Sequence, residues 1–255
     1  MDIFRFANPT RFMGFAERWV WILWVLSLAA LGYGLFLIAT ATPPSELHGH
    51  NIRLLFVHVP SAWLALFSYS AMAAASLVGL IWRHPLADVF AMAAAPLGAM
   101  FTALALLTGS IWGNAAWGTW WMWSDSRMTS TLILFLQFVA YIVLVNSFDD
   151  PARGRRVGAW LIIIGIANVF IVKYGVNWFN SLHQQASVDA SGSSISGVYL
   201  RQLFSMLIGF NLLFVALVIG RMRVELDRLR LAQRRAKQKR QAITAGFATG
   251  AATEA

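Results

Sequence analysis

Six apolar runs of membrane-spanning length divide the chain, at residues 19–39, 60–82, 89–111, 131–148, 157–174 and 203–219. A helix needs about 20 largely apolar residues to cross a bilayer. The chain is 58% hydrophobic and 12% charged, with a mean hydropathy of +0.62, which excludes an ordinary soluble domain. The sequence therefore predicts an all-α membrane protein with six transmembrane helices.

The placement of Lys and Arg predicts the orientation of these helices. If the N-terminus is cytoplasmic, only four of the 20 Lys and Arg residues lie outside: Arg53, Arg127, Lys173 and Arg201. Basic residues accumulate in cytoplasmic loops, so we expect both termini inside. The outer loops are then residues 40–59, 112–130 and 175–200.

The C-terminal segment forms a second unit. Residues 1–220 make up the six-helix domain, and residues 221–255 make up a basic cytoplasmic tail that alternates charged and apolar residues at helical spacing. We expect this tail to continue the sixth helix. The net charge of +9 lies mostly in the tail and at the ends of the spans, which favours contact with anionic lipid over nucleic-acid binding.

The outer loop at residues 112–130 is unusually rich in tryptophan. It holds five of the chain's 12 tryptophans, namely Trp112, Trp117, Trp120, Trp121 and Trp123. Tryptophan is common at membrane interfaces, so an ordinary aromatic belt is the simpler interpretation. Such a belt places one or two tryptophans at each helix end, and the density here favours a shelf for a flat apolar ligand.

The histidines sort by side of the membrane. His58 lies in an apolar setting at the outer mouth of the second span, and His183 follows the fifth span on the same side. Each could be a histidine bonded to backbone, but two imidazoles beside an aromatic shelf suit a six-coordinate haem. Zinc fits less well, since cysteine is absent. His48 and His50 are more typical of exposed loop residues than of metal ligands, and His84 lies inside.

The outer cations fit the same interpretation. Arg53 precedes His58 by five residues, and Arg127 closes the tryptophan-rich loop. Haem carries two carboxylates, and arginine binds carboxylates in bidentate geometry. We expect these two arginines to bind the propionates, whereas Arg201 and Lys173 are better explained as interface anchors.

These features resemble the tryptophan-rich WWD domain of haem-handling proteins. Over nearly the whole chain except the tail, the closest resemblance is to the CcmC family of the cytochrome c maturation pathway called System I. The matching segments are Trp112-Gly113, Trp117 to Trp123, Asp125, Arg127, Val57-His58-Val59-Pro60 and Leu182-His183-Gln184.

The resemblance implies a non-catalytic subunit of the bacterial inner membrane whose functional face is periplasmic. Haem b would be transient cargo with His58 and His183 as axial ligands, and it would be delivered to the haem chaperone CcmE. The haem platform and chaperone-docking surface would comprise Trp112, Trp117, Trp120, Trp121, Trp123 and Asp125. Implied partners are the ABC transporter subunits CcmA and CcmB and the small helper CcmD. CcmA would hydrolyse ATP, because this chain has no Gly-rich phosphate loop.

One position departs from the family pattern. The family reads Trp-x-Trp-Asp-x-Arg, whereas here Ser124 separates Trp123 from Asp125. We expect Asp125 to take the acid's role after a one-residue bulge. The alternative is that Ser124 occupies the acid's place.

Three other functions remain open at this stage. A cytochrome b-like electron-transfer subunit would place its histidines deep in facing helices. A secondary transporter would want carboxylates at mid-membrane, where the chain has only Gln137, Asn168 and Asn211. A purely structural subunit would use the tryptophans as anchors.

Overall fold

The structure is a computed structural model that describes residues 8–179, 181–183, 188–189, 192–193 and 195–253. Within the expected third outer loop, residues 180, 184–187, 190–191 and 194 lie outside the described residues. The helices are α1 (Pro9–Thr40), the 3₁₀ helix η2 (His50–Leu54), α2 (Leu55–Trp82), α3 (Pro85–Trp117), α4 (Ser126–Asn146), α5 (Pro151–Trp178) and α6 (Gly197–Thr253). Two short antiparallel strands, β1 (Val188–Asp189) and β2 (Gly192–Ser193), pair in the third outer loop. Six helices are long and apolar enough to cross a membrane, which confirms the predicted fold class.

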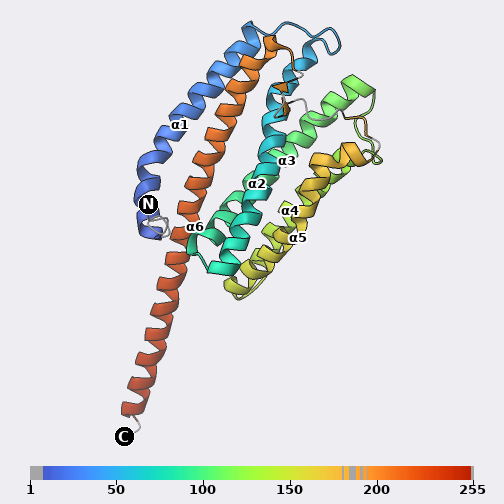
Figure 1. Cartoon of the computed structure of the whole chain (residues 1–255). Coiled ribbons are helices and arrows are strands. Elements are labelled where there is room, and N and C mark those ends of the chain that lie inside the picture. The colour runs from blue at the N-terminus through green and yellow to red at the C-terminus, as the bar shows by residue number, and fades with distance from the viewer. Residues whose placement is uncertain (1–7, 180, 184–187, 190–191, 194, 254–255) are drawn as a thin grey trace.

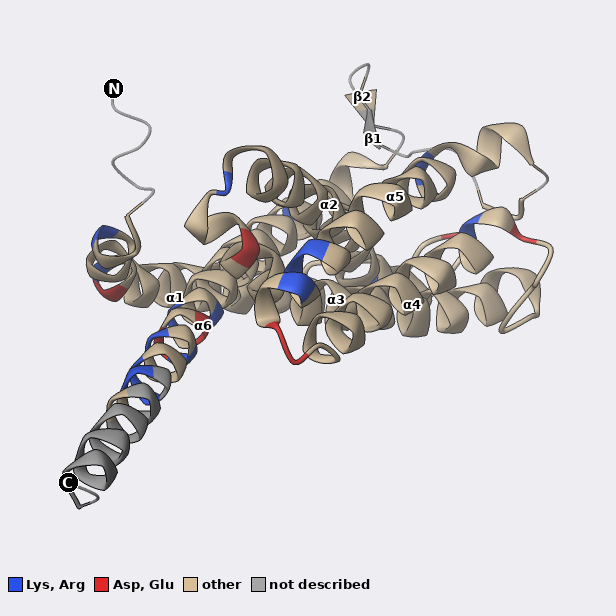
Figure 2. Cartoon of the chain, turned by 90° about the horizontal axis from the view of Figure 1, so that it is seen from below, with Lys and Arg blue, Asp and Glu red and all other residues tan. Residues whose placement is uncertain are grey.

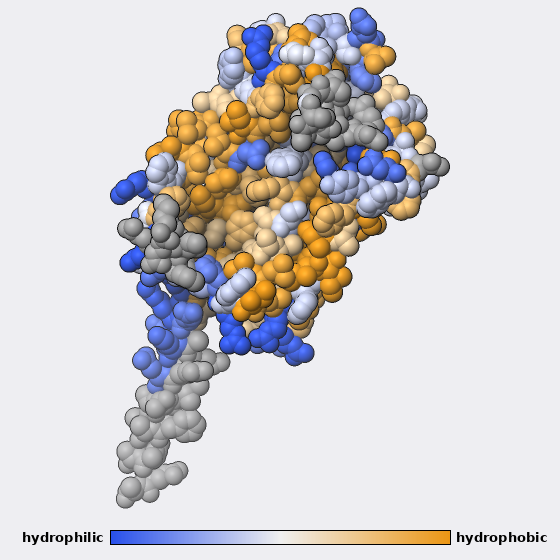
Figure 3. Space-filling view, viewed as in Figure 1, coloured by the Kyte–Doolittle hydropathy of each residue, from blue (hydrophilic) through white to orange (hydrophobic). Residues whose placement is uncertain are grey.

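The helices form a block of four and an attached pair. Helix α2 packs on α3 and α5, and α4 packs on the same two helices, while α1 runs along α6 and α6 contacts α2 and α3 (Figure 1). Both described ends of the chain lie toward one end of the bundle (Figure 1). An apolar surface covers its flanks, and hydrophilic residues gather at its two ends (Figure 3). We call the end with the termini the inner end and the opposite end the outer end.

Small residues bring the helices of the block close together. Gly98 of α3 lies directly against the Phe138 ring of α4, and Gly165 of α5 lies against the Tyr69 hydroxyl of α2. Tyr69 and Phe138 are fully buried and meet edge to face at 5.2 Å. Lipid chains are as apolar as the protein core, so close packing of this kind is what holds transmembrane helices together.

Local capping signals set where several helices begin. Asn8, His84 and Asp150 each precede a proline, and each accepts a hydrogen bond from a backbone N–H in the first turn of α1, α3 or α5. Proline suits the first helical position because its missing N–H would have no partner there. These helices therefore begin before the apolar runs that predicted them.

Helix α3 also ends later than its apolar run. It continues through Trp112 and Gly113 to Trp117, and Gly118 then ends it with a φ of 74°. That left-handed conformation favours glycine. The non-helical segment before α4 is therefore residues 118–125, shorter than the expected loop of 112–130.

The basic tail is helical, as its spacing predicts. Helix α6 continues without a break to Thr253, and its Lys and Arg residues cluster where it leaves the bundle (Figure 2). Near this point Arg223 pairs with Glu17 of α1 at 3.4 Å.

Candidate functional site

His58 stands in the first turns of α2, facing α3. Its Nδ1 lies 3.0 Å from the hydroxyl oxygen of Thr108. A side chain at Gly109 would come within 3.1 Å of the imidazole carbon Cε1, so this glycine gives the ring room against α3. Sequence analysis identified His58 but neither of these neighbours on α3.

His183 lies beyond the end of α5, next to the N-terminus of α4. Its Nδ1 is 3.2 Å from Oδ1 of Asp125 and 3.3 Å from Oδ2. The Trp117 indole packs edge to face on the imidazole, with ring centroids 4.9 Å apart. A carboxylate and a tryptophan therefore fix the orientation of this ring.

Asp125 ties the segment after α5 to the start of α4. It is the N-cap of α4, and its Oδ1 accepts hydrogen bonds from the backbone N–H groups of Arg127 (3.0 Å) and Met128 (2.9 Å). Its Oδ2 accepts from the Ser181 hydroxyl at 2.7 Å and the Leu182 N–H at 2.8 Å. With 1% of its surface exposed, Asp125 is buried, so it offers its hydrogen bonds to these neighbours and not to solvent.

Burial and hydrogen bonding shift the pKa values of Asp125 and His183 in opposite directions. Burial alone would raise the pKa of Asp125, but the Met128 N–H, the Ser181 hydroxyl and the nearby His183 hold it below the usual value. Burial lowers the pKa of His183, and the Asp125 carboxylate offsets part of that shift. At neutral pH the pair is therefore a carboxylate facing an uncharged imidazole.

The first turn of α4 adds a cation close to His183. The charge of Arg127 lowers the pKa of His183, in opposition to the Asp125 carboxylate, which raises it. Arg127 is half-buried in the first turn of α4. Arg53, the other expected propionate ligand, is exposed in the last turn of η2, just before α2.

The shelf divides into packed and exposed tryptophans. Trp120 and Trp123 are 58% and 72% exposed, while Trp121 packs against Trp123 with centroids 5.4 Å apart. The indole N–H of Trp121 is buried and has no hydrogen-bond partner among the described residues. A buried donor of this kind is unusual, and a carboxylate of a bound ligand would satisfy it.

The first outer loop contacts the same end. His48 packs on the Trp112 indole with centroids 4.5 Å apart. Within the described residues, no group of three or more His, Asp or Glu side chains could hold a metal ion. Haem needs only two protein ligands, whereas a structural zinc site needs four and a catalytic one three.

Sequence reasoning missed Thr108 and Ser181, the two hydroxyl residues that contact this site. Thr108 lies inside an apolar span, where a threonine commonly bonds the carbonyl four residues earlier, and it does so here with Leu104 at 2.7 Å. Ser181 lies between Trp178 and His183 in the sequence, and both of these residue types are stronger indicators of a haem site than a serine. Only the packing of α2 on α3, and of the segment after α5 on α4, reveals their partners.

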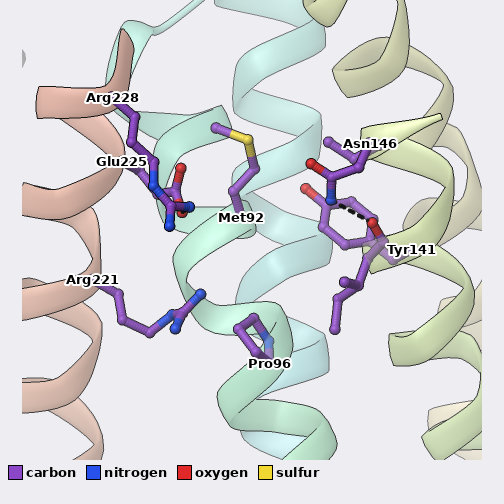
Figure 4. Close-up of a pocket in the computed structure, with 9 residues that line it drawn as sticks. Met92, Pro96, Tyr141, Asn146, Arg221, Glu225 and Arg228 are labelled. Atoms are coloured by element: carbon purple, nitrogen blue, oxygen red, sulfur yellow. Dashed lines mark hydrogen bonds and ion pairs between the residues drawn. The ribbon is translucent and has the colours of Figure 1, made fainter. Parts of the chain in front are cut away.

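A separate hollow of about 260 Å³ opens at the inner end, between α3, α4 and α6 (Figure 4). Arg221 and Arg228 of α6 line one side, and Tyr141 and Asn146 of α4 line the other (Figure 4). Arg221 also donates from Nε to the Ala93 carbonyl at 3.1 Å, near Pro96. This hollow has no part of the histidine cluster in its lining.

Comparison with known proteins gives the family. The family model described as "Heme exporter protein C", CcmC, matches residues 2–239. The chain belongs to the CcmC family. It is similar to the "Heme exporter protein C" of Bradyrhizobium diazoefficiens, with 45% identity over 98% of this chain and 93% of that protein.

Other members of the CcmC family are similar over shorter or more divergent stretches. The protein of the same description from Paracoccus denitrificans is 38% identical over 94% of this chain and 100% of its own length. That of Escherichia coli is 39% identical over 71% of this chain and 73% of its own. The resemblance seen in the tryptophan-rich segment is thus confirmed across the chain.

Proposed function

We propose that this protein binds haem b at the outer end of its bundle and delivers it to the haem chaperone CcmE for the maturation of c-type cytochromes. His58 and His183 are the axial ligands of the iron, and Arg127 binds a propionate. Arg53 binds the second propionate from η2. The tryptophans cover the porphyrin and leave one edge for the chaperone.

The observation that carries this proposal is that both histidines lie against α3. His58 contacts α3 through Thr108, and His183 contacts its last residue, Trp117. Each has its Nδ1 engaged, by Thr108 or by Asp125, which leaves Nε2 for a metal. Trp121 adds a buried N–H without a partner among the described residues, suited to a propionate oxygen.

Membership of the family supports the following proposal for the partners and the cellular location. As in the System I pathway, the protein works in the bacterial inner membrane with its outer end in the periplasm. CcmA and CcmB, the ABC transporter subunits, and the helper CcmD assemble with it, and CcmA hydrolyses the ATP. The chain itself is a binding subunit without catalytic chemistry.

The test is the absorption spectrum of the affinity-purified protein. We expect a Soret band of low-spin haem in the wild type, and reduced haem with a shifted spectrum in His58→Ala and His183→Ala, partly restored by added imidazole. His50→Ala is the matched control, because it removes an exposed imidazole from the same outer end. Wild-type spectra in both ligand variants would contradict the assignment.

The runner-up function, a cytochrome b-like electron-transfer subunit, makes a different prediction. Its haem would be reduced rapidly by a quinol and would stay with the protein. Haem delivery predicts instead that the haem leaves with CcmE and that quinol does not reduce it in a turnover assay. Both histidines lie at one end of the bundle, which favours delivery.

The orientation has its own test. Reporter fusions after Leu47 and Trp117 should report the periplasm, and fusions after Arg83 and Arg155 should report the cytoplasm. A cytoplasmic signal at Trp117 would place the shelf on the wrong side for c-type cytochrome maturation.

The inner end carries a further partner, anionic lipid. The tail places Arg221 and Arg228 where α6 leaves the bundle, beside the hollow of Figure 4. Basic residues near an anionic leaflet each contribute roughly 1 kcal/mol of attraction. Binding of the purified protein to anionic rather than zwitterionic vesicles, lost at high salt, would support this contact.

A further inference from the structure

The two candidate axial histidines are held by acceptors of different strength. We propose that Asp125 and Thr108 are positioning residues that make the two axial bonds unequal, so that His183 anchors the haem and His58 is the ligand released at handover. This rests on the proposed ligation by His58 and His183. It adds an order of events that the family resemblance does not give.

The tautomer of His183 follows from its partner. Asp125 already accepts four hydrogen bonds, from two N–H groups of α4, the Ser181 hydroxyl and the Leu182 N–H. A carboxyl group whose two oxygens accept four hydrogen bonds is favoured in its ionised form, and an ionised carboxylate can only accept. The proton between Asp125 and His183 therefore lies on Nδ1, and Nε2 carries the free lone pair.

The tautomer of His58 follows from the other bonds of Thr108. The single hydroxyl proton of Thr108 is donated to the Leu104 carbonyl at 2.7 Å, so its oxygen must accept from His58 Nδ1 at 3.0 Å. His58 thus also presents Nε2 to a ligand, but its acceptor is an uncharged hydroxyl.

This difference in charge sets the strength of the two ligands. A carboxylate that accepts from the second nitrogen of a metal-bound imidazole raises its basicity, and losing such a partner typically costs 10–100-fold in metal affinity. A neutral hydroxyl or carbonyl acceptor polarises the ring less. His183 is therefore the stronger donor to iron, although it stands on a non-helical segment.

Asp125 also fixes the non-helical segment that carries His183. Its carboxylate is 1% exposed and contacts Ser181, Leu182 and His183. The proposed ligand and the two residues before it are therefore held by the same buried group, which we call the Asp125 anchor. Trp117 closes the other side of the His183 ring at 4.9 Å. The side chain that hydrogen-bonds the His58 ring is the uncharged Thr108.

Handover is then a ligand exchange with no net redox change. The iron–Nε2 bond to His58 breaks, and the lone pair leaves with the imidazole. The vacated axial position accepts a lone pair from the recipient protein, while His183 stays bound until that second bond has formed. The oxidation state of the iron is the same before and after.

The experiment compares matched variants of the haem-loaded full-length protein. Asp125→Asn keeps an oxygen for capping α4, since Asn is also a good N-cap, but it replaces the charge that faces His183. Thr108→Val removes the acceptor of His58 at nearly constant shape, and Thr108→Ser restores it. Ser181→Ala removes the hydrogen bond to the Asp125 anchor and the one that the Ser181 hydroxyl accepts from the His183 backbone N–H at 3.1 Å, but it leaves the carboxylate facing the imidazole.

Two readouts are measured for each variant: haem loss to an excess of an apo-globin scavenger, and the added imidazole concentration that half-displaces the weaker axial ligand. Asp125→Asn should lose haem 10–100-fold more readily, the range seen for such partners. Thr108→Val should hold haem but yield its sixth ligand to less imidazole. Thr108→Ser should resemble the wild type, and Ser181→Ala, which keeps the charge facing His183, should lose haem less readily than Asp125→Asn.

The variants that lack one histidine complete the experiment. We expect His58→Ala to retain five-coordinate haem that binds imidazole without competition, and His183→Ala to lose most of its haem. If His58→Ala loses more haem than His183→Ala, or Thr108→Val more than Asp125→Asn, then His183 is not the stronger ligand, although both histidines can still bind haem. If neither histidine variant changes the spectrum, haem ligation itself is wrong.

Discussion

The middle of the bundle and its outer end use aromatic side chains in opposite ways. In the middle, Tyr69, Phe101 and Phe138 are at most 1% exposed and fill the space between helices. At the outer end, Trp120 and Trp123 leave 58% and 72% of their surface open. The middle therefore uses its aromatics for folding, whereas the outer end keeps large apolar surface available for a ligand.

Polar groups differ in the same way. Asn168 of α5 donates to the Ser130 carbonyl at 2.9 Å and to Gln137 at 3.3 Å, and Gln137 donates to the Gly165 carbonyl at 3.4 Å. These amides join α4 to α5 and offer no carboxylate for ion transport. At the outer end, by contrast, the buried Trp121 N–H has no hydrogen-bond partner among the described residues.

The largest effect on stability should come from filling the close approach in the middle. Gly98→Ala puts a methyl group into the Phe138 ring and 2.8 Å from the Ser68 hydroxyl oxygen. Overpacking a core costs roughly 1–3 kcal/mol, so the thermal unfolding temperature in detergent should fall clearly. Gly32→Ala is the control, because nothing lies within 4 Å of a side chain there. Equal unfolding temperatures in the two variants would show that the middle is not tightly packed.

Acid should weaken the outer end. Both His183 and Asp125 have a lowered pKa in the folded protein. Below about pH 6.5 the unfolded chain gains protons on this histidine that the folded chain does not, so stability falls. A further loss follows as the pH drops through the pKa of folded Asp125.

The measurement is thermal unfolding of the haem-free protein from pH 8 to below pH 3, because the lowered pKa of Asp125 places its response below the usual value of 3.8. His183→Ala should flatten the part of the curve that begins near pH 6.5, and Asp125→Asn the more acidic part. A curve for His183→Ala that parallels the wild type would remove His183 as the source of the acid response.

A smaller effect on stability, but a clear one on the site, is expected for Gly109→Ala. The added methyl group would lie 3.1 Å from Cε1 of His58, so the ring must shift by a few tenths of an ångström. Alanine is the better helix former, which offsets part of the strain. The unfolding temperature should change little while the Soret band moves; an unchanged band would mean that α3 does not position His58.

The sequence predicted the architecture well because membrane burial leaves a strong signal. Each span is a long apolar run, and proline after a capping residue marks the starts of α1, α3 and α5. It did not predict that α3 would continue to Trp117, because Trp112, Gly113 and Asn114 read as a polar, Gly-containing loop. The turn is set by Gly118, whose positive φ becomes evident only in the fold.

The sequence indicated which residues belong to the candidate site, but not which residues contact one another there. His58, His183, Arg127 and the tryptophans stood out by their side of the membrane and their density. The partnership of Asp125 with His183 spans 58 positions and that of His58 with Thr108 spans 50, so local patterns do not reveal either. The extra Ser124 is exposed, and Asp125 fills the buried N-cap position.

The smallest effect on stability should come from the exposed tryptophans, and it decides what the outer end is for. Trp120→Ala and Trp123→Ala remove side chains that are mostly open, so each should change the unfolding free energy by less than about 0.5 kcal/mol. Trp117→Ala is the contrast, because it removes the indole that packs on His183 at 4.9 Å. We expect Trp117→Ala to lower haem content, and Trp120→Ala and Trp123→Ala to lower co-purification of CcmE more than haem content. If the exposed tryptophans instead prove as costly to unfolding as Gly98→Ala, the outer end is part of the folding core and the contrast between the two regions fails.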